Sequence, residues 1–343
     1  MTAPPRRPRI LVIKLGALGD AVIATAHIQA LLDSRPGAEV HLLTSPACDF
    51  LFRGESRLRI ASFPRKGARA MWATFRWLRR QRFDQVFDFQ CSDRSRVMTL
   101  LSGAPLRAGL GPAWPYSLRP AEDDPGWPIF DRLNNLLQAA GMGPAPPRPR
   151  LWTQPRDEAM ARDLMAGLGL APGGFVVMHA GSNPTWQSKR WEEEHFATLA
   201  RKLAGLGLVT LWVGGQGEAD LNARLAAASG IDLTARLSLP GLAALARHAR
   251  FAVTNDSAPM HILSTAGIPV YALFGPTNWR ISHAVGQAER VLRHPVPCSP
   301  CHLTACPPER DHACLRALLP EQVLERLQAD GLLDQVQDAS SDS

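Results

Sequence analysis

The stretch FAVTNDSAPMHILSTAGIPVYALFGPTNW, residues 251–279, decides the fold of this chain. It indicates a buried strand, a polar turn, a short helix and a second buried strand, in that order, over residues 251–253, 254–257, 261–266 and 268–274. Pro259 is typical of the first turn of a helix, and Gly267 of the position that ends one. A helix that follows a parallel strand directs backbone N–H groups at the crevice where such folds bind ligands. The stretch therefore predicts a site for an anion, most simply a phosphate.

Two ionisable residues flank this turn, Asp256 at the cap and His261 about one helical turn later. An ordinary βαβ unit with an ordinary helix cap would also fit the spacing. However, polar, small and Pro residues fill the turn, and binding residues concentrate on loops of this kind. We therefore expect a functional site here.

Strands and helices alternate along the rest of the chain, in two halves. In the first half we expect strands over residues 9–15, 40–43, 85–89 and 107–110, helices over 21–34 and 130–140, and a long loop over 112–128. In the second half we expect strands over 175–179, 208–213 and 231–233, and helices over 157–168, 192–206, 219–228 and 241–249. The pattern predicts an α/β fold with two doubly wound, Rossmann-like domains facing a central cleft.

The boundary between the two domains is expected at the Pro-rich stretch 141–149, which is typical of a linker. This gives domains over residues 1–150 and 151–320, followed by a C-terminal helix and a polar tail over 321–343, whose last residues, 338–343, we expect to be disordered.

Composition places the chain among soluble globular proteins, because 45% of its 343 residues are hydrophobic and 20% are charged. No apolar run approaches the length of a membrane span. The apolar run over residues 10–15 is too short for the core of a signal peptide, so we expect a cytoplasmic protein.

The net charge of +7 is unevenly placed, since residues 53–82 hold ten basic residues against one acid, Glu55. Trp72, Phe75 and Trp77 lie among them. The segment suits a basic amphipathic helix at an anionic surface such as a membrane, and a solvated helix face fits equally well. Nucleic acid is not expected, because no nucleic-acid-binding motif accompanies the charge.

The first predicted strand leads into a glycine loop, residues 16–20, with the sequence GALGD. Its glycines form G-x-x-G, so the G-x-G-x-x-G fingerprint of dinucleotide-binding proteins is absent and an NAD-dependent oxidoreductase is disfavoured. Asp20 ends the loop, where it could cap the helix or serve as a carboxylate for proton transfer.

Loops of the second half should meet at one edge of their sheet. Gly181 and Ser182 offer hydrogen-bond donors, and Lys189 offers an ammonium group for phosphate. Glu218 could accept hydrogen bonds from a ribose diol, while Ser257 and its neighbouring amides could hold phosphate. Together they predict a pocket for a nucleoside diphosphate. The chain contains no D-x-D motif of paired carboxylates, so we expect no metal ion and no other cofactor in the reaction.

Four stretches resemble glycosyltransferase family 9, the ADP-heptose:lipopolysaccharide heptosyltransferases: KLGALGD, HAGSNPTWQSKRW, GGQGE and TNDSAPMHILSTAGIPVYALFGPTN. The resemblance extends over about residues 9–327. It implies the two-domain GT-B architecture, with residues 1–150 as the N-terminal acceptor-binding domain and residues 151–320 as the C-terminal nucleotide-sugar-binding domain. It also implies an inverting, metal-independent transfer of heptose from ADP-heptose to the inner core of lipopolysaccharide, on the cytosolic face of the inner membrane.

The resemblance also implies roles for individual residues. Asp20 takes the place of the general base, Lys189 that of the lysine on the diphosphate, with Gly181 and Ser182 as its loop partners. Glu218 matches the ribose ligand, and Leu237 falls where adenine packs. The turn that holds phosphate and sugar corresponds to Asp256, Ser257, Ala258 and His261. Ala258 departs from the D-[ST]-G of many relatives, which removes glycine's conformational freedom there.

Two alternatives to heptose transfer stay open. One is a member of the same family that uses another nucleotide sugar or another acceptor. The other is a nucleotide- or polyanion-binding protein without catalysis, in which Asp20 only caps its helix.

Four cysteines, Cys298, Cys301, Cys306 and Cys314, form the pattern C-x2-C-x4-C-x7-C, with His302 and His312 between them. A similar cluster occurs in a heptosyltransferase II-like branch of the family. A structural zinc site, reduced packed thiols and redox-linked pairs all fit this spacing. In a cytosolic protein we expect no structural disulfides.

Overall fold

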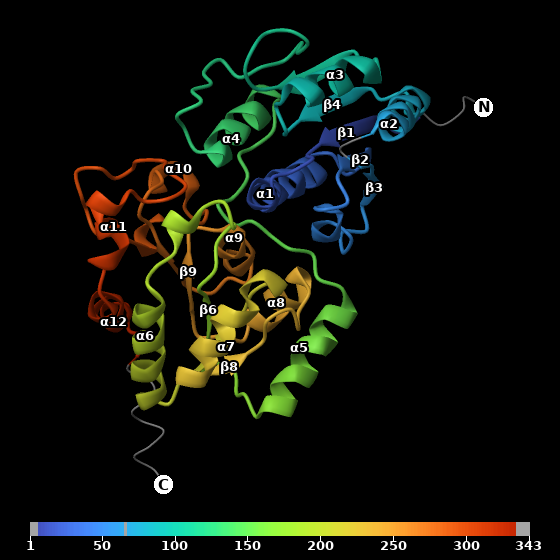
Figure 1. Cartoon of the computed structure of the whole chain (residues 1–343). Coiled ribbons are helices and arrows are strands. Elements are labelled where there is room, and N and C mark those ends of the chain that lie inside the picture. The colour runs from blue at the N-terminus through green and yellow to red at the C-terminus, as the bar shows by residue number, and fades with distance from the viewer. Residues whose placement is uncertain (1–5, 65–66, 334–343) are drawn as a thin grey trace. The chain divides into compact units, whose positions relative to one another are not determined.

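The computed structural model describes residues 6–64 and 67–333. The chain divides into two compact units, Met1–Gln154 and Pro155–Ser343, each with its own parallel β-sheet flanked by helices. Figure 1 shows both units, which are described separately below. The α/β class predicted from the sequence is confirmed. The polar tail expected over residues 338–343 lies outside the described residues.

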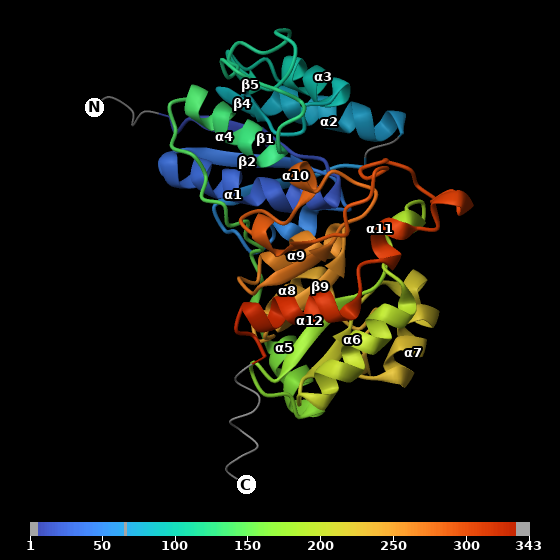
Figure 2. The same ribbon diagram turned by 90° about the vertical axis from the view of Figure 1, so that its left-hand side faces the viewer.

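Within its described residues, the first unit has a five-stranded parallel sheet of order β3-β2-β1-β4-β5. The strands are β1 (Arg9–Ile13), β2 (Glu39–Thr44), β3 (Leu58–Ser62), β4 (Gln85–Asp88) and β5 (Leu106–Gly109). Helices α1 (Leu18–Ser34) and α4 (Ile129–Ala139) pack together, and α2 (Ala68–Gln81) packs with α3 (Asp93–Ser102). The two pairs cover opposite faces of the sheet (Figure 2), so β1 is buried on both faces.

The described part of the second unit has a six-stranded parallel sheet of order β11-β10-β9-β6-β7-β8. The strands are β6 (Phe175–His179), β7 (Val209–Trp212), β8 (Ile231–Asp232), β9 (Ala252–Asn255), β10 (Val270–Leu273) and β11 (Val291–Leu292). The longer helices are α5 (Pro155–Leu168), α6 (Glu193–Gly205), α7 (Ala219–Ala228), α8 (Leu239–Ala246), α9 (Ala258–Ser264) and α12 (Pro320–Ala329). Helices α5, α8 and α9 form one layer, and α6, α7 and α12 the other.

Single-turn helices complete this unit. They are α10 (Trp279–Ser282), α11 (Ala313–Arg316) and the 3-10 turns η2 (Gln187–Lys189), η3 (Gln216–Glu218), η4 (Ala288–Arg290) and η5 (Pro308–Arg310). In the first unit, η1 (Asp49–Leu51) precedes β3. Residues 141–149, expected as a linker, contain no helix or strand.

The structure adds elements that the sequence pattern did not predict. Strand β3 was missed because only Leu58 in it is fully buried, which leaves no continuous apolar run. Strand β11 has two residues, and helix α3 is largely polar. Such elements are stabilised by their sheet neighbours and by capping rather than by a strong hydrophobic period.

Two helices begin earlier than predicted. Helix α1 begins at Leu18, so Asp20 lies inside its first turn, and α9 begins at Ala258 with Ser257 as its N-cap. The expectation that Asp256 occupies the cap of α9 is therefore wrong by one residue. The Pro259 ring lies in the first turn of α9, where its missing N–H costs no hydrogen bond.

Candidate nucleotide-sugar site

Three neighbouring strands of the second unit, β6, β9 and β10, end at the same edge of their parallel sheet. The loops that leave these carboxyl ends begin with Ala180, Asp256 and Phe274. Ligands of such folds bind beyond the carboxyl ends of parallel strands. Candidate residues predicted from the sequence lie on the loops at this edge.

Lys189 and Asp256 meet at this edge. The Lys189 Nζ lies 2.7 Å from Asp256 Oδ2, and the Thr277 hydroxyl donates to the same oxygen at 2.6 Å. The Lys189 ammonium also lies 4.8 Å from the centre of the Trp186 ring. The Asp256 side chain is 8% exposed and that of Lys189 is 19% exposed, so the carboxylate is buried and the ammonium borders solvent. This places a cation where an anionic ligand can reach it.

A second chain of polar contacts joins Glu218 to Ser257 through His179. The His179 Nε2 lies 3.3 Å from Glu218 Oε1, and the Ser257 hydroxyl lies 3.2 Å from His179 Nδ1. Burial alone would raise the pKa of Glu218, but the hydrogen bond from His179 and the charge of Arg190 hold its pKa below the ordinary value. Glu218 is therefore an ionised acceptor, the state that a hydroxyl ligand requires.

The Glu218 carboxylate lies against the backbone of two glycines. It accepts a hydrogen bond from Gly215 N at 2.7 Å. A Cβ added at Gly181 would clash with the same carboxylate, and a Cβ at Gly214 would lie 2.6 Å from its Oε2. Because Gly181 and Gly214 have no side chain, the Glu218 carboxylate can lie close to the backbone of the loops that follow β6 and β7.

The structure identifies three polar residues that the sequence analysis did not single out. His179 ends β6 and Thr277 follows β10, as described above. Asn255 ends β9 and is fully buried. Its amide donates to Ala180 O at 2.7 Å and Gly181 O at 3.1 Å, and its Oδ1 accepts from Trp191 N. A polar residue at the end of an apolar strand is the signal that could have identified His179 and Asn255.

Other predicted site residues lie on the same loops without entering these two chains. The Ser182 hydroxyl donates to Trp186 O at 2.8 Å and accepts from Arg190 Nε at 3.0 Å, so it shapes its own loop. Leu237 is half-buried just before α8, and Ala258 and His261 are half-buried on α9. The roles expected for these residues stay predictions.

In the first unit, Asp20 is exposed in the first turn of α1. The N-cap of this helix is Ala17, so the alternative that Asp20 caps the helix is wrong. The glycine loop is fixed by Gln90, whose Oε1 accepts from Leu15 N at 2.8 Å and Gly16 N at 3.0 Å. The Asp20 side chain is thus exposed in the helical turn that follows this loop, whose backbone Gln90 holds.

Lys14 lies beneath this loop and is only 2% exposed. Its ammonium donates to Phe89 O at 3.1 Å. Burial lowers the pKa of Lys14, while the negative charge of Asp20 and of Asp88 opposes that change. The sequence analysis included Lys14 in the predicted strand over residues 9–15 and assigned it no role.

The four clustered cysteines are all free, and with His312 they line one small cavity. Burial and the neighbouring thiols raise the pKa of Cys314 to about 11. The His312 ring bonds Ser188 O at 2.8 Å and lies 3.2 Å from Glu192 Oε1. In residues 6–64 and 67–333, no three or more His, Cys, Asp or Glu side chains are placed to hold a metal ion. A zinc site, packed thiols and redox-linked pairs all stay predictions, and metal analysis of untagged protein tests the zinc site.

None of the helices in the described part of the chain combines the length and apolar character needed to cross a membrane.

A sequence model of the family described as glycosyltransferase family 9 (heptosyltransferase) matches residues 71–311. Lipopolysaccharide heptosyltransferase 1 of Pseudomonas aeruginosa is 30% identical over 190 residues, which are 50% of this chain and 52% of that protein. The alignments thus span about half the length of the first curated relatives.

Solved structures share the fold over nearly the whole chain. The glycosyl transferase family 9 protein of Veillonella parvula has a TM-score of 0.81 at 21% identity, covering 96% of this chain and 97% of that protein. The ADP-heptose lipopolysaccharide heptosyltransferase II of Escherichia coli has a TM-score of 0.72 at 21% identity, covering 96% and 99%. The predicted GT-B fold class is confirmed by these likenesses.

Proposed function

We propose that this chain, because it belongs to glycosyltransferase family 9, transfers heptose from ADP-heptose to the inner core of lipopolysaccharide. The relatives from Pseudomonas aeruginosa and Escherichia coli reported above are named as lipopolysaccharide heptosyltransferases, and the name of the E. coli protein includes ADP-heptose. The donor, the acceptor and the activity are therefore proposals that rest on the family and on the site.

One observation supports this function above the others: Lys189 and Glu218 lie at the same sheet edge, each held by a buried partner. Lys189 is held by Asp256, and Glu218 by His179. A nucleoside diphosphate needs a cation for its phosphates and an acceptor for its ribose hydroxyls, and these two side chains supply both. Leu237 would pack against the adenine, and Ser257 would donate to a phosphate.

The proposed reaction is a direct displacement with inversion. The acceptor hydroxyl attacks the anomeric carbon of the heptose, and Asp20 takes the proton of that hydroxyl. The bond between the anomeric carbon and the diphosphate oxygen breaks, and its electron pair leaves with ADP. Lys189 stabilises the charge that develops on this oxygen, so the reaction needs no metal ion.

The proposal is tested by a transfer assay that combines donors and acceptors. Purified protein is incubated with ADP-heptose or with UDP-sugars, each with truncated lipopolysaccharide cores, and nucleotide release is measured together with product mass. We expect ADP release that depends on the acceptor. Turnover only with a UDP-sugar would favour another donor, and ADP binding without any turnover would favour the non-catalytic alternative.

The role of Asp20 is tested in the same assay by Asp20→Asn. We expect kcat to fall by about 10² to 10⁴, the usual contribution of a general base, with ADP affinity unchanged. The control is Asp33→Asn. Asp33 lies on the same helix α1, and its side chain is 59% exposed and pairs with Arg57. Substantial turnover by Asp20→Asn would remove Asp20 from the base role.

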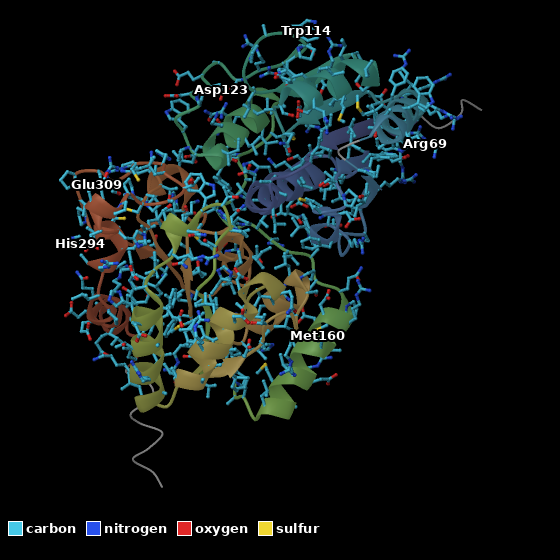
Figure 3. The ribbon with its side chains drawn as sticks, in the orientation of Figure 1. Arg69, Trp114, Asp123, Met160, His294 and Glu309 are labelled. Carbon is cyan, nitrogen blue, oxygen red and sulfur yellow. The ribbon has the colours of Figure 1, made fainter. Side chains whose placement is uncertain are left out.

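We also propose that the protein acts at the cytosolic face of the inner membrane, through helix α2. This helix carries exposed Arg69 (Figure 3), Arg76 and Arg80 together with Trp72, which is 60% exposed. Arg69, Trp72, Arg76 and Arg80 recur at three- or four-residue spacing and share one helix face. Arginine beside an exposed tryptophan suits an anionic lipid surface.

A further inference from the structure

A cavity of about 290 Å³ opens at the carboxyl end of β10, apart from the Lys189–Asp256 pair. Its lining includes Thr277, Asn278, Trp279, Arg280, Arg293 and Ser299. These residues belong to the loop after β10, to α10 and to the segment after β11, so the cavity is formed within the second unit. The two chains of contacts assigned to the nucleotide sugar use only Thr277 of this set.

The cavity is strongly cationic. The Arg280 guanidinium lies 4.8 Å from the centre of the Trp279 ring, and that of Arg293 lies 5.7 Å from it. No Asp or Glu lines the cavity, and among the described residues neither guanidinium forms an ion pair with a carboxylate. Two like charges gathered on one aromatic ring repel each other unless an anion lies between them.

Three neutral polar groups of the lining already form hydrogen bonds within the unit. The Thr277 hydroxyl donates to Asp256, and the Ser299 hydroxyl donates to Gly275 O at 2.6 Å. The Asn278 Oδ1 accepts from Arg280 N at 3.1 Å. The two guanidiniums are the charged groups of the lining, and their planar N–H forks match phosphate and carboxylate oxygens.

We propose that this cavity binds an acidic group, phosphate or carboxylate, of the acceptor substrate. The inference rests on the proposed transferase function. Thr277 lines the cavity and also bonds Asp256, so the cavity adjoins the candidate donor site through one residue. The donor diphosphate has its own cation there in Lys189, which leaves the two arginines for the second substrate. A volume of about 290 Å³ is large enough for one charged group with part of a sugar ring.

Arg280→Gln, Arg293→Gln and the double variant test the assignment. We expect the acceptor KM to rise about tenfold in each single variant, and further in the double variant, because each loses a charge-assisted hydrogen bond. ADP affinity, measured by calorimetry, should change less than about twofold. Arg224→Gln is the matched control, since Arg224 is an exposed arginine of the same unit that pairs with Glu193. Unchanged thermal unfolding shows that the variants are folded.

The outcomes separate the sources of the anion. A fall in ADP affinity with an unchanged acceptor KM would assign the arginines to the donor diphosphate and overturn the proposal. Unchanged values for both substrates would also overturn it. If the unmodified protein shows no turnover, the proposed function fails, and titration with inorganic phosphate still tests the cavity. Phosphate binding that the double variant loses would support an anion site, whereas equal binding by both proteins would refute it.

Discussion

The ion pair between Lys189 and Asp256 is expected to affect both the stability of the protein and its binding of a nucleotide. The Asp256 carboxylate is nearly buried and is held by the Lys189 ammonium and the Thr277 hydroxyl. Removing one partner of such a pair leaves the other charge buried and under-compensated, which is costly. A bound diphosphate would share the same ammonium. Lys189 is therefore expected to affect both the free energy of unfolding and ligand binding.

We expect Lys189→Gln to weaken ADP binding about tenfold and to lower the melting temperature. Calorimetry and thermal unfolding measure the two effects. Lys202→Gln is the control, because Lys202 is an exposed lysine that pairs with Glu321 on the surface. Adding Asp256→Asn should recover part of the lost stability, since the uncompensated charge is then gone. Equal ADP affinity for Lys189→Gln and the unchanged protein would contradict the assigned role.

A single methyl group tests the placement of Glu218. In Gly181→Ala the new Cβ would clash with the Glu218 carboxylate, which must then leave His179. We expect ADP affinity to fall about tenfold as the ribose acceptor is displaced. Gly217→Ala is the matched control on the neighbouring loop, where a Cβ meets nothing within 4 Å. If both variants bind ADP equally well, Glu218 does not contact the nucleotide.

At the scale of elements, helix α2 of the first unit combines exposed apolar side chains with exposed arginines. Its buried side rests on Thr74 and Leu78, while Met71 and Trp72 are 57% and 60% exposed. The rings of Trp72 and Phe75 lie 5.6 Å apart. Exposed aromatic surface beside several arginines is costly in water and favourable at a lipid headgroup layer.

We expect the protein to sediment with vesicles that contain anionic lipid, and to be released as salt increases. Arg76→Glu and Trp72→Ser should each reduce the fraction of protein bound to the vesicles. Arg76→Glu should weaken the free energy of membrane binding by about 2 kcal/mol, because it reverses a charge. Trp114→Ser is the control, because Trp114 is a 63% exposed tryptophan of the same unit outside α2. Equal loss of binding in the control, or equal binding to uncharged vesicles, would argue against α2 as the contact.

At the scale of the whole molecule, acid stability should depend on a buried histidine of the first unit. His27 on α1 is fully buried between Phe89 and Phe130, and its Nε2 bonds Phe130 O at 2.9 Å. Burial lowers the pKa of His27 to about 4. Between that value and 6.5 the unfolded chain binds a proton that the folded chain does not. Stability is therefore present above pH 6.5 and lost as the pH falls.

The shift corresponds to about 3 kcal/mol lost between pH 7 and pH 4. His27→Gln removes the titrating group and can keep the hydrogen bond to Phe130, so it should flatten the pH dependence of unfolding between pH 6.5 and 4.5. Burial also lowers the pKa of His41 and of His195, so these histidines, together with carboxylates, provide the remaining acid sensitivity in both proteins. Denaturant unfolding at several pH values measures the effect. Parallel curves for the two proteins would show that His27 does not control acid stability.

The sequence alone determined the alternation of strands and helices and the turn types at the strand ends. Apolar runs such as residues 9–15 and 175–179 are buried on both faces in any parallel sheet, so their pattern needs no tertiary information. The same local chemistry placed Asp20, Lys189, Glu218 and Ser257 in the segments that follow strands β1, β6, β7 and β9.

Only the tertiary structure decided which of these residues touch. It joined Lys189 to Asp256 and Glu218 to Ser257 by way of His179, and it added Thr277 and Asn255. It also gathered Arg280 and Arg293 around Trp279. The physical reason is that sheet order and side-chain packing bring together groups dozens of residues apart, and a local pattern contains no record of strand order. Short or half-exposed elements such as β3 and β11 depend on the same non-local pairing.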